Sequence, residues 1–298
     1  MKIQKVKGLD VKPPKKSAFT IDTPEHLFKM NQLVLCCGVR GSGKTTGLIN
    51  LIRMYMEHDI IQRVILISPT YFSNKELFEP LNIDEENDVY EAEKESLDKV
   101  VENISKEVTE YNEYLEKKKK YKDFQKTINS DTPINMIDPN LIIMYQEMGF
   151  LNNEKPVWKY KNDKHPPRVY IVVDDAIGSD VYSTKSKLVH LSMKHRHINN
   201  GIGVSIAMLL QTYSATGNNS CPRCIRENAT MIMLFKNSQD AQIKKIYDEV
   251  GDSDLTEEQF IKMFHYATQE PHSFLCIDKA PKDKTKKYRK NFNEYLIF

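Results

Sequence analysis

The stretch LVLCCGVRGSGKTTGLINLIRMYME, residues 33–57, decides the fold that the rest of the chain completes. It starts with a fully apolar run, continues as a glycine-rich loop and ends with apolar residues at helical spacing. The loop satisfies the pattern G-x-x-x-x-G-K-[ST] through Gly38, Gly43, Lys44 and Thr45. A strand, such a loop and a helix in this order predict a phosphate-binding site, because the unpaired N–H groups at the helix start point at the phosphates. A glycine-rich turn without a ligand is the alternative, and it would leave Lys44 unpaired among backbone donors.

The nucleotide-binding residues follow from this loop. Glycines at 41 and 43 let the backbone wrap around the β-phosphate without a Cβ in the way. We expect Lys44 to reach the β- and γ-phosphates and the Thr45 hydroxyl to bind Mg²⁺. The predicted contacts to ATP and Mg²⁺ are Gly38, Gly41, Ser42, Gly43, Lys44, Thr45 and Thr46.

Further apolar runs after the loop predict the remaining strands. They lack polar residues almost entirely, which is typical of strands buried on both faces, and their spacing leaves room for crossover helices. The runs are VILIS at 64–68, VYIVV at 169–173, VSIAMLL at 204–210, TMIMLF at 230–235 and SFLCI at 273–277. The sequence therefore predicts an α/β fold with a mainly parallel central sheet flanked by helices.

Polar side chains directly follow two of these runs. Asp174 and Asp175 come after 169–173, and ligands of open α/β sheets bind at the carboxyl ends of the strands. Asp174 is suited to hold Mg²⁺ and Asp175 to activate the attacking water, although a turn pair that caps the next helix is the alternative. Gln211 follows the next strand and is expected to contact the γ-phosphate or the water. A helix cap by Thr212 or Ser214 is the other interpretation there.

Composition limits the classes of function. The 298 residues are 40% hydrophobic and carry 43 Lys and Arg against 41 Asp and Glu, a net charge of +2. Any nucleic-acid site must therefore be a local basic patch. The five cysteines are expected to be reduced thiols, and the C-x-x-C at 221–224 is expected to be a turn at a helix start and not a zinc site. No apolar stretch reaches the roughly 18 residues of a membrane span and the N-terminus has no signal-peptide pattern, so an intracellular protein is expected.

The charge pattern divides the chain into segments. Residues 1–30 form a basic arm, 31–280 an ATPase domain and 281–298 a basic C-terminal tail. A charged helical insertion is expected at about 75–160, as a helical hairpin exposed to solvent. A contact with DNA or a partner is the alternative for this insertion.

Six motifs, taken in order, resemble the viral genome-packaging ATPases of the FtsK/HerA superfamily, the poxvirus-type group shared by large DNA viruses and virophages. They are GVRGSGKTT at 38–46, LISPTYFSNK at 66–75, IVVDDAIGSD at 171–180, KHRHINNGIGVSIAMLLQTY at 194–213, IRENATMIMLF at 225–235 and HYATQEPHSFLCID at 265–278. The resemblance implies a RecA-like ASCE fold, a homo-oligomeric ring, and ATP-driven translocation of double-stranded DNA into a preformed capsid. It also implies capsid proteins as partners and a location in the viral factory or the virion.

Motors of this kind complete each active site with an arginine from the neighbouring subunit. Arg196 and Arg226 are the candidates, with a surface cation or a helix C-cap as the alternative for each. Two rival functions stay open at this point. One is another P-loop enzyme, a helicase or a nucleoside kinase, and the other is a nucleotide-gated structural ATPase that binds DNA or capsid protein without turnover.

Overall fold

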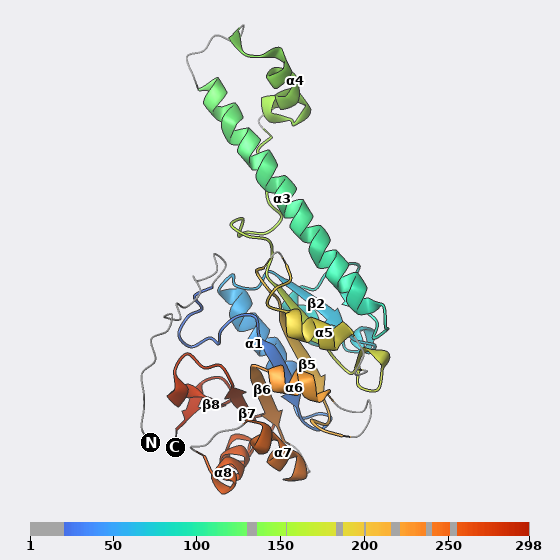
Figure 1. The fold of residues 1–298 in the computed structure, drawn as a ribbon, viewed down its shortest axis with the longest axis vertical. Helices are drawn as coiled ribbons and strands as arrows, with labels where there is room; N and C mark the ends of the chain where they lie inside the picture. Colours follow the sequence, from blue (N-terminus) through green and yellow to red (C-terminus); the bar gives the residue numbers. More distant parts are fainter. Residues whose placement is uncertain are drawn as a thin grey trace, which may run out of the picture.

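The computed structural model describes residues 21–129, 136–152, 154–182, 187–199, 201–215, 221–236, 240–250 and 255–297. The molecule consists of an α/β core and one long arm that projects from it (Figure 1). The described part of the chain contains no helix that is both long and apolar enough to cross a membrane.

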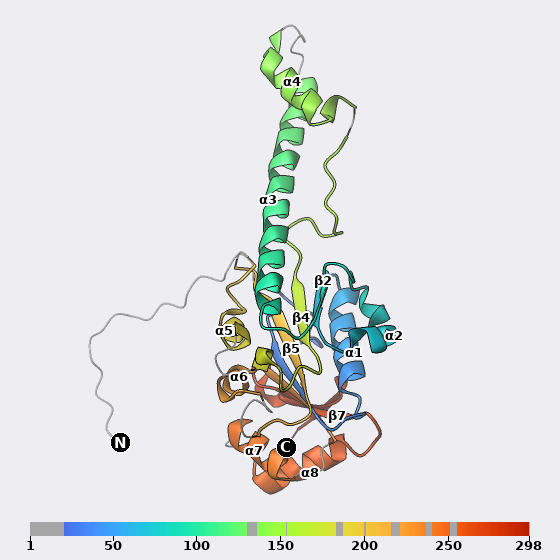
Figure 2. The ribbon, with the colours of Figure 1, turned by 90° about the vertical axis from the view of Figure 1, so that its right-hand side faces the viewer.

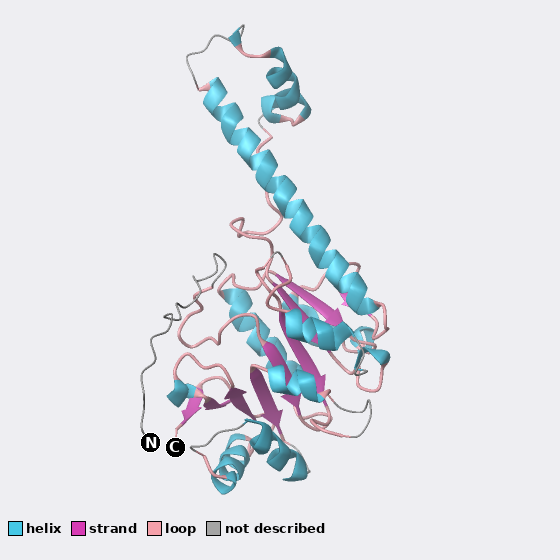
Figure 3. Ribbon diagram, in the orientation of Figure 1, coloured by secondary structure: helices cyan, strands magenta, loops and turns pink. Residues whose placement is uncertain are grey.

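A mixed central sheet forms the core (Figure 3). The described strands are ordered β3-β2-β4-β5-β1-β6-β7-β8-β9; neighbouring strands are parallel from β3 to β6, and β7, β8 and β9 are added antiparallel. The strands are β1 Leu33–Cys37, β2 Arg63–Ile67, β3 Val89–Tyr90, β4 Val169–Val173, β5 Ser205–Leu210, β6 Met231–Phe235, β7 Phe274–Asp278, β8 Tyr288–Lys290 and β9 Glu294–Leu296. The predicted α/β class with a mainly parallel sheet is confirmed.

Two apolar layers cover the two faces of this sheet (Figure 2). Alternate residues of a strand point to opposite faces, so Leu33 and Leu35 join one layer while Val34 and Cys36 join the other. The first layer contains side chains of the long helix α3 and of α5 to α8, and the second contains those of α1 and α2. The helices are α1 Lys44–Glu57, α2 Lys75–Phe78, α3 Ser96–Ile128, α4 Pro139–Glu147, α5 Lys187–Lys194, α6 Arg223–Asn228, α7 Asp240–Val250 and α8 Glu257–Ala267.

The arm differs in two ways from the insertion expected at about 75–160. Its first part belongs to the core, because Phe78 and Leu81 are buried in the α1 layer and β3 pairs with β2. The arm itself begins with α3, whose 33 residues span about 50 Å at about 1.5 Å each. The chain returns through the short helix α4 and a largely non-helical segment, so the expected hairpin of two helices is wrong in its second half (Figure 1).

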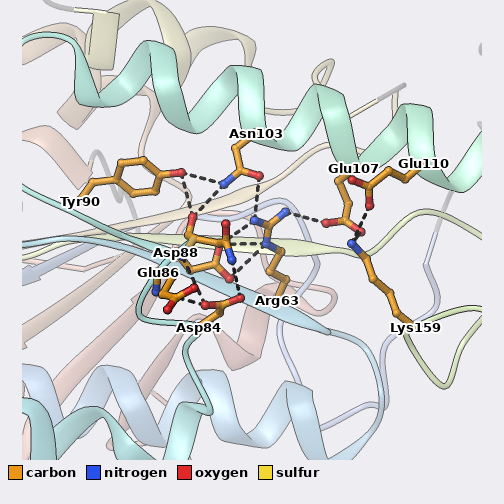
Figure 4. A network of polar contacts seen from close by, with 10 residues as sticks. Arg63, Asp84, Glu86, Asp88, Tyr90, Asn103, Glu107, Glu110 and Lys159 are labelled. Carbon is orange, nitrogen blue, oxygen red and sulfur yellow. Dashed lines mark hydrogen bonds and ion pairs between the residues drawn. The ribbon is translucent and has the colours of Figure 1, made fainter.

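A buried ion network fixes the base of the arm to the sheet (Figure 4). Arg63 is the first residue of β2 and only 7% of its side chain is exposed. Its guanidinium donates to Asp88 at 2.6 Å, to Glu107 of α3 at 2.8 Å and to Asn103 of α3 at 3.0 Å. Lys159 of the returning segment binds Glu107 at 2.6 Å from the other side. Glu107 of α3 therefore joins the returning segment, through Lys159, to the buried Arg63 of the sheet.

The predicted C-terminal tail is part of the sheet, because β8 and β9 extend it beyond β7. Arg289 of β8 is buried between the rings of Phe28 and Tyr295, and its guanidinium donates to the carbonyl of His26 at 2.9 Å. Within the predicted N-terminal arm, Leu27 is likewise buried in the core. Residues 1–20 of that predicted arm lie outside the described residues.

Candidate nucleotide-binding site

The loop between β1 and α1 has the backbone that its glycines predict. Gly41 and Gly43 have φ angles of 75° and 95°, in the left-handed region that glycine adopts without a steric penalty. A Cβ on Gly38 would lie 2.6 Å from Cβ of Phe235 and 2.8 Å from Oγ of Ser42. Oγ of Ser42 is buried and has no hydrogen-bond partner among the described residues. This loop is shaped for backbone donors to surround an anion, which would also give the Ser42 hydroxyl an acceptor.

Lys44 lies across the loop at the first position of α1. Its Nζ donates to the carbonyls of Gly38 and Val39, both at 2.9 Å. Burial lowers the pKa of Lys44, and the negative charges of Asp174 and Asp175 oppose this shift. The ammonium group is thus placed where bound phosphates would meet it, and it shares an electrostatic environment with the two aspartates.

The two aspartates follow β4 at the carboxyl edge of the sheet. The backbone N–H of Asp174 donates to the carbonyl of Ile67 at 3.0 Å, which continues the pairing of β4 with β2. Burial, together with the charge of Asp175, raises the pKa of the Asp174 carboxyl to about 6, although the charge of Lys44 opposes this shift. Asp175 has a φ of 51°, so the chain turns sharply here and presents two successive carboxylates. Two successive carboxylates, one half-buried and one exposed, form an oxygen donor set that suits Mg²⁺.

Gln211 joins the aspartates from the neighbouring strand. It follows β5, which lies between β4 and β1, and its Nε2 donates to Oδ1 of Asp175 at 3.5 Å. This contact places Gln211 beside the carboxylate that is predicted to activate the water, and the sensor role of Gln211 stays a prediction. The structure therefore brings the phosphate loop, Asp174, Asp175 and Gln211 to one edge of the sheet.

The structure separates the two candidate arginines. Arg226 of α6 is 6% exposed and donates to both carboxylate oxygens of Glu249, at 2.9 and 3.0 Å, and to the carbonyl of Cys221 at 2.6 Å. Its guanidinium also packs 5.2 Å from the ring of Tyr213. The side chain of Arg226 is therefore engaged in a buried pair within its own chain, which does not favour it as the arginine of a neighbouring active site, and its role there stays a prediction.

Arg196 is exposed and lies just beyond α5. Its neighbour His195 is fixed by a hydrogen bond between Nε2 and the carbonyl of Asn31 at 3.0 Å, and its carbonyl accepts from Val204 N–H at 2.8 Å. Asn31 and Val204 precede β1 and β5, so Arg196 lies at the amino edge of the sheet, opposite the phosphate loop. Arg196 can complete a nucleotide site only if that site belongs to another subunit.

The C-x-x-C sequence is a turn at the start of α6, as expected. Pro222 is the residue before the helix, and Cys221 is buried. Among the described residues no group of three or more His, Cys, Asp or Glu side chains is arranged to hold a metal ion.

A cavity beside the phosphate loop was not predicted from the sequence. It has a volume of about 720 Å³ and lies between α1 and the C-terminal segment, where its lining includes Gly43, Asn50, His272, Asn291 and Tyr295. His272 has a φ of 64°, and its Cβ would come within 2.9 Å of a Cβ on Gly43. The site thus joins residues more than 200 positions apart. The only signal in the sequence is the motif at 265–278, which contains His272.

The fold and the site together define a P-loop nucleotide-binding protein, with one strand between the phosphate-loop strand and the strand that carries the acidic pair. No model of a known protein family matches the sequence, and no curated protein matches it.

Solved structures do resemble the chain. The genome packaging NTPase B204 from Sulfolobus turreted icosahedral virus 2, in complex with sulfate, is 13% identical over 90% of this chain and 98% of that chain, with a TM-score of 0.47. Its complex with AMPPCP is 13% identical over 89% and 99%, with a TM-score of 0.46. EssC, ATPases 2 and 3, from Geobacillus thermodenitrificans is 11% identical over 89% and 40%, with a TM-score of 0.44. At these identities and TM-scores the functional inference rests on the side chains of the site and on the ordered motifs.

Proposed function

We propose that the protein binds and hydrolyses ATP at the carboxyl edge of its sheet. The observation that carries this proposal is the convergence of Lys44, the acidic pair and Gln211, the last of which contacts Asp175 at 3.5 Å. A protein that only binds nucleotide has no need of a carboxylate beside the γ-phosphate position. The structure supports hydrolysis because it adds a polar contact that orients this carboxylate.

Each residue has a distinct part in this reaction. The loop N–H groups and Lys44 bind the phosphates and stabilise the charge that develops on them. Asp174 and the Thr45 hydroxyl would hold Mg²⁺, which supplies charge neutralisation at the β- and γ-phosphates when it is bound. Asp175 accepts a proton from the attacking water, and Gln211 orients that carboxylate and the water. Many related hydrolases carry Glu at the position of Asp175, so the shorter side chain requires a closer approach of the water.

The cavity between α1 and the C-terminal segment is the proposed site for the nucleoside. It adjoins Gly43, and its lining combines the faces of Phe292 and Tyr295 with the polar side chains of Asn50 and His272. An aromatic and polar lining of this kind suits a flat base and a ribose.

The ordered motifs extend the proposal to the class of motor. We infer a homo-oligomeric ring that translocates double-stranded DNA into a preformed capsid, with capsid proteins as partners, acting in the viral factory or the virion. The placement of Arg196 supports a shared active site, because this exposed cation lies on the edge of the sheet opposite the phosphate loop of its own chain.

The test is ATP turnover by the purified protein with and without double-stranded DNA. A motor is expected to hydrolyse ATP faster when DNA is present. Phosphoryl transfer to an added nucleoside would instead identify a kinase, and nucleotide binding without turnover under all conditions would identify a structural ATPase.

A further inference from the structure

Positive charge is concentrated on the middle of the arm. Residues 117–126 of α3 and 155–164 of the returning segment contain ten lysines and two aspartates, a net charge of +8, whereas the whole chain carries only +2. We call these two segments the lysine collar. The rest of the chain, taken together, is therefore net acidic, and the collar is a local basic patch of the kind that a polyanion recognises.

The two segments of the collar form one surface. Lys118 of α3 forms an ion pair with Asp163, and the hydroxyl of Tyr114 donates to the same carboxylate at 2.8 Å. The rings of Tyr114 and Trp158 pack with their centroids 5.3 Å apart. Between the segments lies a groove of about 560 Å³ whose lining includes Lys122, Lys155 and Lys161.

These three lysines are available to a ligand. Lys122, Lys155 and Lys161 are exposed, and none of them forms an ion pair within the described part of the chain. By contrast, Lys118 and Lys159 are engaged with Asp163 and with Glu107. The groove thus lies between two segments that are held together by ion pairs and aromatic contacts, and it carries lysines without an ion-pair partner among the described residues.

The arm holds the collar at a defined place. On α3 the collar starts 21 residues after the start of the helix, about 30 Å along it, whereas on the returning segment Lys159 of the collar reaches back to Glu107 near the sheet. Arg63 and Lys159 tie α3 and the returning segment to the sheet at the base (Figure 4). A charged surface at a fixed distance from the ATPase core can hold a long ligand while the core changes state.

We propose that the lysine collar binds the phosphate backbone of double-stranded DNA, as a contact surface separate from the ATPase core. This inference rests on the proposed function in taking DNA as the substrate of the motor. Every cation of the collar is a lysine, a point charge without the planar fork that reads guanine. Phosphate contacts made by such charges carry no sequence information, which suits a protein that must move along any sequence.

The experiment compares two triple variants of the full-length protein. In one, Lys122, Lys155 and Lys161 are each replaced by Gln. In the control, the exposed lysines at positions 94, 99 and 106 near the base of α3 are each replaced by Gln, which removes the same charge outside the collar. Binding of a labelled duplex of mixed sequence is measured by fluorescence anisotropy over a series of salt concentrations.

The collar variant is expected to bind the duplex at least about tenfold more weakly than wild type. The slope of log K against log salt should fall by about 1 for each lysine that contacts a phosphate. The control should bind like wild type, and both variants should keep the basal ATPase rate, because the substituted residues lie far from the phosphate loop.

Equal binding by the collar variant and the control overturns the inference. So does a collar variant that keeps its duplex affinity but loses affinity for a polyglutamate peptide, because the surface would then be one for acidic protein. If the collar-dependent binding holds but DNA never stimulates wild-type ATP turnover, the DNA surface stands and the translocase proposal fails. The two failures are therefore distinguishable.

Discussion

Among single residues, Lys44 carries the sharpest prediction. Replacing Lys44 by Ala should abolish ATP turnover, because the charge that develops on the γ-phosphate would lose the cation placed against it. Steady-state ATPase assays measure this directly. The exposed Lys245 of α7 provides a matched control, and its replacement by Ala should leave turnover unchanged. Retention of more than a small fraction of turnover by Lys44→Ala would refute the phosphate-loop assignment.

The two aspartates should separate in their effects. Asp174→Asn is expected to weaken Mg²⁺-dependent nucleotide binding, whereas Asp175→Asn should leave ATP bound and slow its hydrolysis, because only Asp175 is assigned to the water. Equilibrium binding of a fluorescent ATP analogue and single-turnover hydrolysis report the two steps independently. An equal loss of affinity in both variants would contradict this division of roles.

The raised pKa of Asp174 predicts a pH dependence of metal binding. Since this pKa is about 6 in the free protein, the carboxylate is charged above pH 6 and becomes protonated as the pH falls below it. Protons then compete with Mg²⁺, so apparent Mg²⁺ affinity should drop by up to about tenfold per pH unit below 6. Mg²⁺-dependent nucleotide binding, measured at a series of pH values from about 5 to about 8, tests this prediction. Asp174→Asn should flatten the profile, and a profile unchanged in this variant would assign the titration to another group.

On the scale of the elements, the attachment of α3 depends on Arg63. Arg63→Met leaves Asp88 buried without its cation and leaves Glu107 with Lys159 alone, and breaking a buried pair in this way costs about 3–5 kcal/mol. Arg53→Met on α1 is the control, because it removes an exposed pair with Glu57 that is worth about 1 kcal/mol or less. Urea denaturation should show the large loss for Arg63→Met alone. Equal stability of the two variants would mean that the network contributes nothing net.

The elements that could be predicted from the sequence are those whose own residue types indicate that they are buried or that the backbone turns. Strands such as β4 are apolar throughout because both faces are covered, and the phosphate loop needs its glycines for local backbone reasons. Strand β8 gives no such signal, since the sequence YRK is basic. The burial of Arg289 depends on contacts with the ring of Tyr295 and with that of Phe28, which lies 261 residues away in the sequence. Local pattern cannot report such long-range pairing.

The same physical reason explains which parts of the site could be predicted. The acidic pair and Gln211 follow apolar strands, so their position at the sheet edge can be read directly from the sequence. The ion pair of Arg226 cannot be read from the sequence, because its partner Glu249 lies 23 residues away on another helix. The nucleoside cavity needs α1 and the C-terminal segment to meet, which only the folded chain reveals.

For the molecule as a whole, the important relation is between two opposite edges of one sheet. The phosphate loop and its aspartates lie at the carboxyl edge, and Arg196 lies at the amino edge beside a cavity lined by Gln32 and Asp278. One rigid chain cannot bring these edges together. If Arg196 completes a nucleotide site as predicted, the two edges must meet between neighbouring subunits of the proposed ring, and ATP turnover would then depend on that interface.

Mixing two inactive variants tests this shared site. Arg196→Ala protein should bind ATP normally yet hydrolyse it poorly, because it keeps an intact phosphate loop but offers no arginine to its neighbour. Lys44→Ala protein is inactive in its own site and still carries Arg196. In mixed rings some interfaces pair an intact loop with an intact arginine, so ATP turnover should reappear although neither parent has it.

The control for this experiment is Arg226→Ala, which should lose stability through the unpaired Glu249 and should not behave as a complementing partner. An arginine that acts within its own chain gives no rescue, because no subunit of the mixture holds both groups, and a monomeric enzyme gives none either. Failure of rescue in a preparation shown to contain mixed oligomers would remove the shared site. The proposed ring would then be left without its shared site, because Arg196 lies across the sheet from its own phosphate loop and could reach a bound nucleotide only in a neighbouring subunit.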